Sequence, residues 1–298
     1  MTTTEQNPSK SEPFPLVVWD RPPSPRHVGL VLGGGAARGF AHIGVLEVLE
    51  EAGIPIHIVA GCSVGAIIGA LCAAGIPAAQ QHELVHGLRW TTLSTLSLLP
   101  RGLSSLNLSL KGFPLGLLDL DKLIAWMQVS MGDVQQFNQL KLPFAAVATD
   151  IVTSELVVMN SGEIGPAVRA SCSVPGVFTP FRREGRLLVD GGVIANLPVQ
   201  VARQMGAEYV IAVDLLPVPR EQRKEPENIV ELSFTSIYAL IRANQGYGEQ
   251  ADCTIVPDIA EYSLIDLTVA EELIAAGRAA AEAQLDTIRS DLLLLEQE

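Results

Sequence analysis

Gly61-Cys62-Ser63-Val64-Gly65 directly follows the apolar run 54–60 and precedes an uncharged, alanine-rich stretch at 66–74. A G-x-S-x-G sequence between a strand and a helix places the serine on a tight, strained turn at the end of the strand. Side chains at Gly61 and Gly65 would collide where the strand and the helix pack together. The stretch therefore predicts an α/β fold with Ser63 as a nucleophile, although a small-residue turn that merely packs a buried helix has the same pattern.

A second glycine-rich segment, 33–39, follows the short apolar run 28–32 and opens a helical pattern. The backbone N–H groups of Gly33, Gly34 and Gly35 could therefore converge on one anionic oxygen. Arg38 would screen the same charge or hold the loop, and an ion pair with a carboxylate is an equal alternative. The segment lacks the last glycine of a dinucleotide motif and the Gly-Lys-Ser/Thr of a P-loop. We interpret it as a candidate oxyanion site.

The base that would activate the serine cannot be a histidine late in the chain. All five histidines lie before residue 87, which excludes the order Ser, Asp, His of many hydrolases. His42 lies one turn into the glycine-loop helix, where packing and hydrogen bonding are its more common roles. His57 is interpreted as a core residue.

A carboxylate remains as the candidate base. Asp190 ends the apolar run 187–189 and is followed by Gly191 and Gly192, which permit close backbone approach. Burial beside an apolar pocket would raise the pKa of Asp190 and allow it to take the serine proton. An ordinary Asp-Gly turn is the alternative.

The composition of the chain argues against nucleic acids and metals as partners. The 298 residues are 48% hydrophobic and carry a net charge of −13, whereas binding to nucleic acid requires clustered Lys and Arg. The cysteines show no metal-ligand spacing and are typical of reduced thiols in a cytoplasmic protein; they are Cys62, Cys72, Cys172 and Cys253. We expect no nucleic-acid partner, no metal and no other cofactor.

The chain is predicted to contain one domain. Residues 1–26 are expected to form a disordered leader without the apolar core of a signal peptide, and 27–298 the folded domain. The uncharged stretch 52–81 is broken by glycines and prolines into pieces too short to span a membrane. Alternating strands and helices imply right-handed crossovers and a sheet covered on both faces. Strands are expected at 28–32, 54–60, 144–149, 156–159, 187–189, 209–213 and 254–256, and helical patterns at 42–52, 199–205, 229–244 and 269–295.

One segment departs from this alternation. Residues 91–118 contain many leucines among Ser, Gly and Pro, with Arg101 and Lys111 as the only charges. A buried connector that covers a core face would have this composition. A lid or acyl-chain groove that also touches lipid surfaces is the functional alternative.

Five blocks of sequence, taken together and in order, resemble the patatin-like phospholipase family, in particular its bacterial branch related to the neuropathy target esterases. The blocks are GGGAARGFAHIGVL at 33–46, GCSVGA at 61–66, ATD at 148–150, ASCSVPGVF at 170–178 and VDGGVIANLP at 189–198. The resemblance covers roughly residues 28–215, and the combination of blocks is highly specific.

The resemblance implies a three-layer α/β fold with a mostly parallel sheet, and a Ser–Asp dyad without histidine. It makes Ser63 the nucleophile and Asp190 the general base. The oxyanion site would be Gly33, Gly34 and Gly35 with Arg38, and Gly61, Gly65, Gly191 and Gly192 would support the two motifs. Cys62 stands where the family often has threonine, a small-for-small change that should leave the turn intact.

The implied activity is hydrolysis of the carboxylic esters of phospholipids or lysolipids through an acyl-enzyme, with neither metal nor cofactor. A non-catalytic acyl-lipid-binding or regulatory protein on the same scaffold is the alternative of a different class. Acyl transfer and thioester hydrolysis would use the same residues. Peripheral contact with a membrane is expected if 91–118 is a lid, whereas substrate details and oligomeric state are not predicted.

Overall fold

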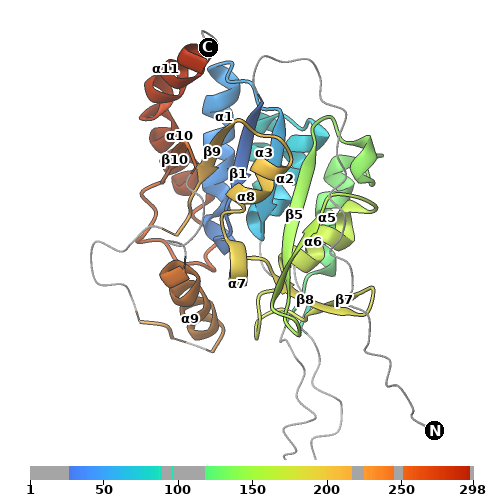
Figure 1. Ribbon diagram of the computed structural model, residues 1–298. Helices are drawn as coiled ribbons and strands as arrows, with labels where there is room; N and C mark the ends of the chain where they lie inside the picture. Colours follow the sequence, from blue (N-terminus) through green and yellow to red (C-terminus); the bar gives the residue numbers. More distant parts are fainter. Residues whose placement is uncertain are drawn as a thin grey trace, which may run out of the picture.

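The computed structural model describes residues 27–86, 88, 95–96, 118–216, 225–227, 229–244 and 251–295. An eight-stranded sheet runs in the order β10-β9-β1-β2-β5-β8-β7, and β6 pairs with β5 outside this path (Figure 1). Its strands are β1 (Val28–Leu32), β2 (Ile58–Cys62), β5 (Phe144–Asp150), β6 (Glu155–Met159), β7 (Phe181–Arg183), β8 (Arg186–Asp190), β9 (Tyr209–Val213) and β10 (Cys253–Ile255). A separate two-stranded sheet pairs β3 (Thr95–Leu96) with β4 (Leu118–Asp119).

The sheet is mixed in direction. The strands from β10 to β5 are parallel, which agrees with the predicted crossovers, while β6, β7 and β8 add antiparallel pairs at one side. The strand predicted at 54–60 begins only at Ile58. Pro55 has no backbone N–H and cannot contribute a hydrogen bond to a ladder.

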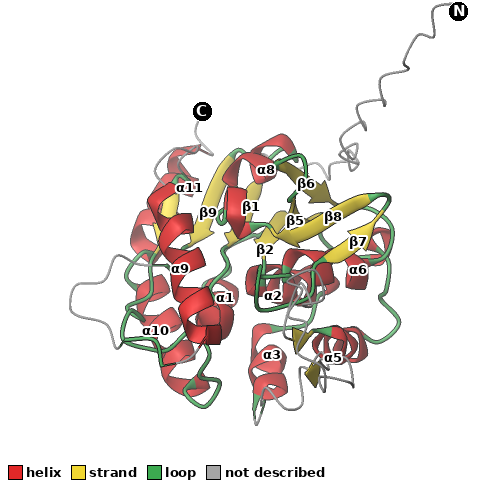
Figure 2. Cartoon of the chain, turned by 90° about the horizontal axis from the view of Figure 1, so that it is seen from below, coloured by secondary structure: helices red, strands yellow, loops and turns green. Residues whose placement is uncertain are grey.

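Helices cover both faces of the sheet, which confirms the predicted α/β class (Figure 2). One face carries α8 (Val199–Gln204), which packs on β1, β2 and β9. The other face is covered by a thicker layer of helices. They are α1 (Phe40–Glu51), α2 (Val64–Ala74), α3 (Ala78–Val85), α5 (Asp121–Met131), α6 (Ile164–Ser171), α10 (Ala270–Glu282) and α11 (Leu285–Leu295).

Successive side chains along each buried strand point into two different core layers, one on each face of the sheet. On β1, Leu30 and Leu32 face the helices of the thick layer, whereas Val31 faces α8. On β9, Ile211 likewise faces the thick layer and Ala212 faces α8. A strand that is apolar on both faces is typical of a parallel sheet covered on both sides, which is why these segments appear as uninterrupted apolar runs.

Two helices from opposite ends of the chain, α1 and α10, cross at very short range. A Cβ on Gly44 of α1 would meet the Ile274 carbonyl oxygen, and one on Gly277 of α10 would meet the Ala41 carbonyl oxygen. The paired glycines let the two backbones touch, so α10 is fixed firmly against α1.

Strand register brings three distant turns to one place. Leu32 at the end of β1 is paired with Gly61 on β2, and Cys62 on β2 is paired with Val147 on β5. On the same edge of β5, one residue further along, Asp190 is paired with Ala148, while β6 occupies the other edge. The glycine loop, the turn after β2 and the end of β8 therefore lie next to one another.

Short helices complete the surroundings of these turns: the 3-10 helix η1 (Ala36–Gly39) after β1 and α7 (Gly192–Ala195) after β8. The long helix α9 (Ile229–Asn244) packs against α7. A further 3-10 helix, η3 (Phe137–Gln139), precedes β5.

Two predicted segments fall mainly outside the described residues: the leader 1–26, and 91–118 apart from Thr95, Leu96 and Leu118. The predicted C-terminal helical stretch, 269–295, contains α10 and α11. Among the residues that the structure describes, no helix has both the length and the apolar character needed to span a membrane.

Candidate active site

Ser63 lies on the sharp turn between β2 and α2. Its backbone has φ 55° and ψ −126°, a combination that a non-glycine residue adopts only under strain. A Cβ on Gly61 would meet the Gly65 carbonyl oxygen, and one on Gly65 would meet the Leu32 carbonyl oxygen. The two glycines thus allow β1, β2 and α2 to approach closely and hold the serine in this conformation.

Asp190 ends β8 and is buried. Its Oδ1 accepts hydrogen bonds from the Gly192 amide at 2.8 Å and from the Cys62 thiol at 3.6 Å. Its Oδ2 is also buried but accepts no hydrogen bond from the described residues. Burial raises the pKa of Asp190 to about 6, although interactions with the Ser63 hydroxyl, the Gly192 amide and the Cys62 thiol oppose the rise. The group is therefore mostly ionised at neutral pH and still able to accept a proton.

The structure brings Ser63 and Asp190 together. The serine hydroxyl interacts with the carboxyl closely enough to lower its pKa. Because Oδ2 accepts no hydrogen bond from the described residues, this contact falls short of hydrogen-bond geometry. Cys62, directly before the serine, uses its thiol to hold the opposite oxygen of the same carboxyl.

The three glycines of the predicted oxyanion site are not equivalent. The Gly33 amide donates to the Val213 carbonyl at 3.1 Å, so the ladder to β9 already uses this donor. Gly34 lies against Ser63, since a Cβ placed on it would come within 3.1 Å of Ser63 Cβ. Gly35 directly precedes η1. The amides of Gly34 and Gly35 are the candidates that remain.

The Arg38 side chain is buried and directed toward the C-terminal part of the chain. Its guanidinium donates to the Tyr262 carbonyl at 2.7 and 3.1 Å and to the Ala260 carbonyl at 3.0 Å. These contacts correspond to the loop-holding role among the sequence alternatives. They tie the glycine loop to residues more than 220 positions away.

His42 and His57 both have packing roles. His42 is fully buried, and its Nε2 lies 2.8 Å from the Gly33 carbonyl oxygen. Burial lowers its pKa to about 4, although the hydrogen bond to Gly33 opposes the fall. A neutral His42 therefore donates to this carbonyl and supports the glycine loop. His57 is half-buried, so the prediction that it lies in the core is wrong; its Nδ1 accepts a hydrogen bond from the Val28 amide at the opposite end of β1.

An apolar cavity of about 80 Å³ opens beside the serine. Ser63 contributes to its lining, and the other lining residues are apolar side chains and one cysteine thiol. They come from η1, α1, α2, α3, α5 and the segments next to α3, α5, α6 and α10: Ala36, Ala37, Phe40, Val64, Ile67, Ile68, Val85, Leu88, Leu120, Leu123, Trp126, Cys172, Val174, Phe178 and Leu267. A cavity of this chemistry suits a hydrocarbon chain whose polar end lies at Ser63.

Sequence reasoning assigned no role to three residues that surround the pair. Ser171, at the end of α6, accepts the Ser63 amide at 2.9 Å and so braces the strained turn. The Asn196 amide nitrogen lies 3.4 Å from the Gly34 carbonyl oxygen. Tyr238, from α9, is buried near Asp190 and the Cys62 thiol, and burial is the main cause that raises its pKa. Ser171 and Asn196 stand inside the recognised sequence blocks, which was the only signal available.

Comparison with known proteins places these features in a family. The family model described as Patatin-like phospholipase matches residues 30–203, more than half of the chain. An uncharacterized NTE family protein of Mycobacterium tuberculosis is 37% identical over 204 residues, which are 68% of this chain and 53% of that protein. Human patatin-like phospholipase domain-containing protein 6 is 38% identical over 190 residues, which are 63% of this chain and 13% of that protein. The chain thus spans about half the length of the first relative and a small part of the second.

Structural comparison agrees with the sequence comparison at the level of the fold. The crystal structure of VipD from Legionella pneumophila superimposes with a TM-score of 0.55 at 16% identity, covering 89% of this chain and 67% of that one. The family match extends from β1, through the strained serine turn, to the end of β8 and into α8. On these grounds the chain belongs to the patatin-like phospholipase family.

Proposed function

We propose that the protein is a serine acyl hydrolase that cleaves the carboxylic ester bonds of phospholipids, lysolipids or related lipids. The observation that carries this proposal is the arrangement at one end of the apolar cavity. A strained serine opens into that cavity, and beside it lies a buried carboxylate, one oxygen of which accepts no hydrogen bond from the described part of the chain.

In the proposed reaction, Ser63 Oγ attacks the ester carbonyl carbon and transfers its proton to Oδ2 of Asp190. The alcohol then leaves with a proton, and an acyl-enzyme remains on Ser63. Water hydrolyses the acyl-enzyme in a second step, which regenerates the serine. A pKa of about 6 suits a base that must be ionised at neutral pH yet accept a proton in the transition state.

Charge on the carbonyl oxygen would be stabilised by the amides of Gly34 and Gly35. The Ser63 amide already donates to Ser171 and the Gly33 amide to Val213, so neither serves this purpose. Arg38 and His42 act indirectly in this scheme, because they hold the glycine loop through backbone carbonyls. One lost oxyanion donor typically costs about 3 kcal/mol of transition-state stabilisation.

The substrate class follows from the cavity lining. With almost no polar group other than the Ser63 hydroxyl, the cavity favours the acyl chain over a sugar, nucleotide or peptide. The names of the relatives, which include patatin-like phospholipase domain-containing protein 6 and an NTE family protein, support a lipid ester as the substrate.

Covalent labelling tests the proposal directly. The purified full chain is treated with a fluorophosphonate probe, and its turnover of p-nitrophenyl esters is measured in parallel. Wild-type protein should be labelled once, on Ser63, and should hydrolyse the esters. Ser63→Ala should lose both properties. Ser161→Ala, which alters an exposed serine outside the cavity, should retain both and serves as the matched control.

Asp190→Asn tests the base separately. It keeps a side chain of the same shape, and it should reduce ester turnover at least 100-fold. Near-normal turnover by Asp190→Asn would refute the proposed base, and absence of labelling in wild-type protein would refute an active nucleophile. Rates on lysophospholipid, triglyceride and acyl-CoA would then separate lipid ester hydrolysis from thioester hydrolysis.

A further inference from the structure

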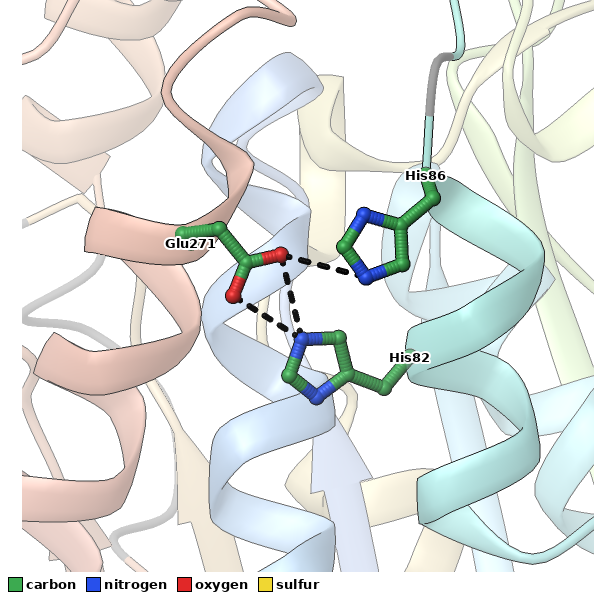
Figure 3. Close-up of side chains that lie close together, drawn as sticks. All are labelled: His82, His86 and Glu271. Atoms are coloured by element: carbon green, nitrogen blue, oxygen red, sulfur yellow. Dashed lines mark hydrogen bonds and ion pairs between the residues drawn. The ribbon is translucent and has the colours of Figure 1, made fainter.

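Three side chains on the outer surface of the thick helical layer converge on one point, away from Ser63. His82 and His86 lie one turn apart on α3 and at its C-terminal end, and Glu271 lies in the first turn of α10 (Figure 3). His82 Nε2 is 3.1 Å from one Glu271 oxygen, and His86 Nε2 is 3.5 Å from the other. All three ligand atoms lie within 4.8 Å of one another.

The two distances to Glu271, 3.1 and 3.5 Å, are close to the edges of a tetrahedral coordination shell. Zinc binds imidazole nitrogen and carboxylate oxygen at about 2.0–2.2 Å, which places neighbouring ligand atoms of a tetrahedron about 3.3–3.6 Å apart. The rings of His82 and His86 are nearly parallel, with 16° between their planes and 5.5 Å between their centres. The Nε2 atoms of both rings lie on the side that Glu271 occupies.

A second layer of contacts orients His82. Its Nδ1 lies 2.8 Å from a carboxylate oxygen of Glu47 on α1, and the other oxygen of Glu47 accepts a hydrogen bond from Arg278 at 2.9 Å. A carboxylate behind a ligating histidine is the usual support of a metal site, because it fixes the ring and leaves the opposite nitrogen for the metal. Nδ1–H of His82 would continue to donate to Glu47 while Nε2 loses its proton to the solvent.

The scaffold holds these groups in place without a metal. Glu47 belongs to α1, and Glu271 and Arg278 belong to α10, which is locked against α1 at Gly44 and Gly277. The third helix, α3, packs on α1, and the Ala78 amide at its start donates to the Glu50 carboxylate of α1. A site assembled on rigid helices loses little conformational freedom when it binds a ligand.

We propose that His82, His86 and Glu271 form a zinc-binding site that joins α3 to α10, with the fourth coordination position left to water. Two histidines and a glutamate are a ligand set that suits Zn²⁺ in preference to Ca²⁺ or Mg²⁺, which prefer all-oxygen shells. The site is separate from the proposed catalytic pair, since none of its ligands lines the apolar cavity.

A metal at this position would also act on the walls of the apolar cavity. Val85, between the two histidines, and Leu88, just beyond them, line the apolar cavity, and Leu267 precedes α10 on the same cavity. A metal that joins His82 and His86 to Glu271 would therefore fix two walls of the cavity relative to each other.

Sequence inspection alone had no means to find this site. His82 and His86 show the helical i, i+4 spacing, but Glu271 is 189 residues away from His82. The expectation that the chain has no metal site followed from the absence of paired cysteine spacing, and the structure places histidines and a glutamate together instead.

Zinc binding is tested on the full chain without a histidine tag, by calorimetric titration with ZnCl₂ and by the absorption spectrum after loading with Co²⁺. We expect one saturable site per chain and the intense visible bands of tetrahedral cobalt, without the charge-transfer band of a thiolate ligand. Glu271→Gln should weaken zinc binding at least about tenfold. Glu272→Gln, an exposed neighbour on the same helix, should change it less than twofold.

Thermal unfolding provides a second readout. Zinc should raise the Tm of wild-type protein and of Ser63→Ala equally, because a ligand that binds only the folded state stabilises it. His82→Asn and His86→Asn should lose the zinc-dependent rise while unfolding normally in a chelator. Absence of saturable binding in wild-type protein, or equal affinity of Glu271→Gln and Glu272→Gln, would reduce the cluster to an ion-pair network and overturn the proposal.

Discussion

Replacement of Asp190 by asparagine should make the folded protein more stable while it removes the proposed base. The carboxylate is fully buried, so its charge is held away from water. Asparagine has the same shape and retains the Oδ1 acceptor that the Gly192 amide and the Cys62 thiol use. Its Nδ2 would face Ser63, whose hydroxyl oxygen is able to accept a hydrogen bond.

The magnitude follows from the shifted pKa. Burial raises the pKa of Asp190 from its ordinary 3.8 to about 6, and each pKa unit corresponds to about 1.4 kcal/mol. The sign is that of a buried acid: its charge destabilises the fold above the folded-state pKa, and the effect vanishes below the unfolded-state pKa. The penalty is about 3 kcal/mol at pH 7.5 and about 1 kcal/mol at pH 4.5, and Asp190→Asn should recover much of it.

Urea unfolding of wild-type protein and Asp190→Asn at both pH values measures the difference. At pH 7.5 the midpoint of the variant should rise by roughly 1 M, and the gain should shrink to about one third at pH 4.5. Asp133→Asn, which alters an exposed carboxylate, should change the free energy of unfolding by less than about 0.5 kcal/mol at either pH. A variant that is less stable than wild type, or a gain that does not depend on pH, would refute the reasoning.

Three other outcomes follow from the same geometry. The kcat/KM for a p-nitrophenyl ester should fall about tenfold per pH unit below a midpoint near pH 6, because the proposed base must be ionised; a flat profile down to pH 4.5 would exclude it. Gly65→Ala should lower the free energy of unfolding by about 3 kcal/mol or more, since the added Cβ meets backbone oxygens. The control Gly69→Ala should cost less, because its added Cβ meets only side chains able to shift. Equal chemical-denaturation midpoints for the two variants would contradict this. Arg38→Met should lower the free energy of unfolding by about 2–4 kcal/mol in thermal denaturation. Arg38→Lys should restore little of this loss, because several carbonyl contacts need the guanidinium fork. Full rescue by lysine would show that the positive charge alone is sufficient.

Much of the fold could be predicted because the sheet is buried on both faces. The runs 28–32 and 209–213 coincide with β1 and β9, since a strand covered on both sides must be apolar throughout. Helices such as α3 and α6 were not recognised. Each has only eight residues, too few for a periodic apolar pattern to stand out.

The candidate site could be predicted only in part. The strained turn at Ser63 could be predicted from local sequence, because such a turn between a strand and a helix requires glycines on both sides. Local sequence gave no reason to separate Gly33 from Gly34 and Gly35, since the bond from the Gly33 amide to Val213 depends on which strand lies beside β1. The contacts of Arg38 with Ala260 and Tyr262 likewise depend on how a distant loop returns to the sheet.

The sequence by itself determined the alternation of strands and helices, the strained serine turn and the family to which the chain belongs. These depend on residues that are neighbours along the chain, where side-chain size and backbone conformation act directly. Only the tertiary structure decided that β8 enters antiparallel beside β5, so that Asp190 lies opposite Ala148 and next to the turn after Cys62. It also decided that burial raises the pKa of Asp190 and that Glu271 meets two histidines of α3, because strand register and the removal of water arise from packing between distant segments.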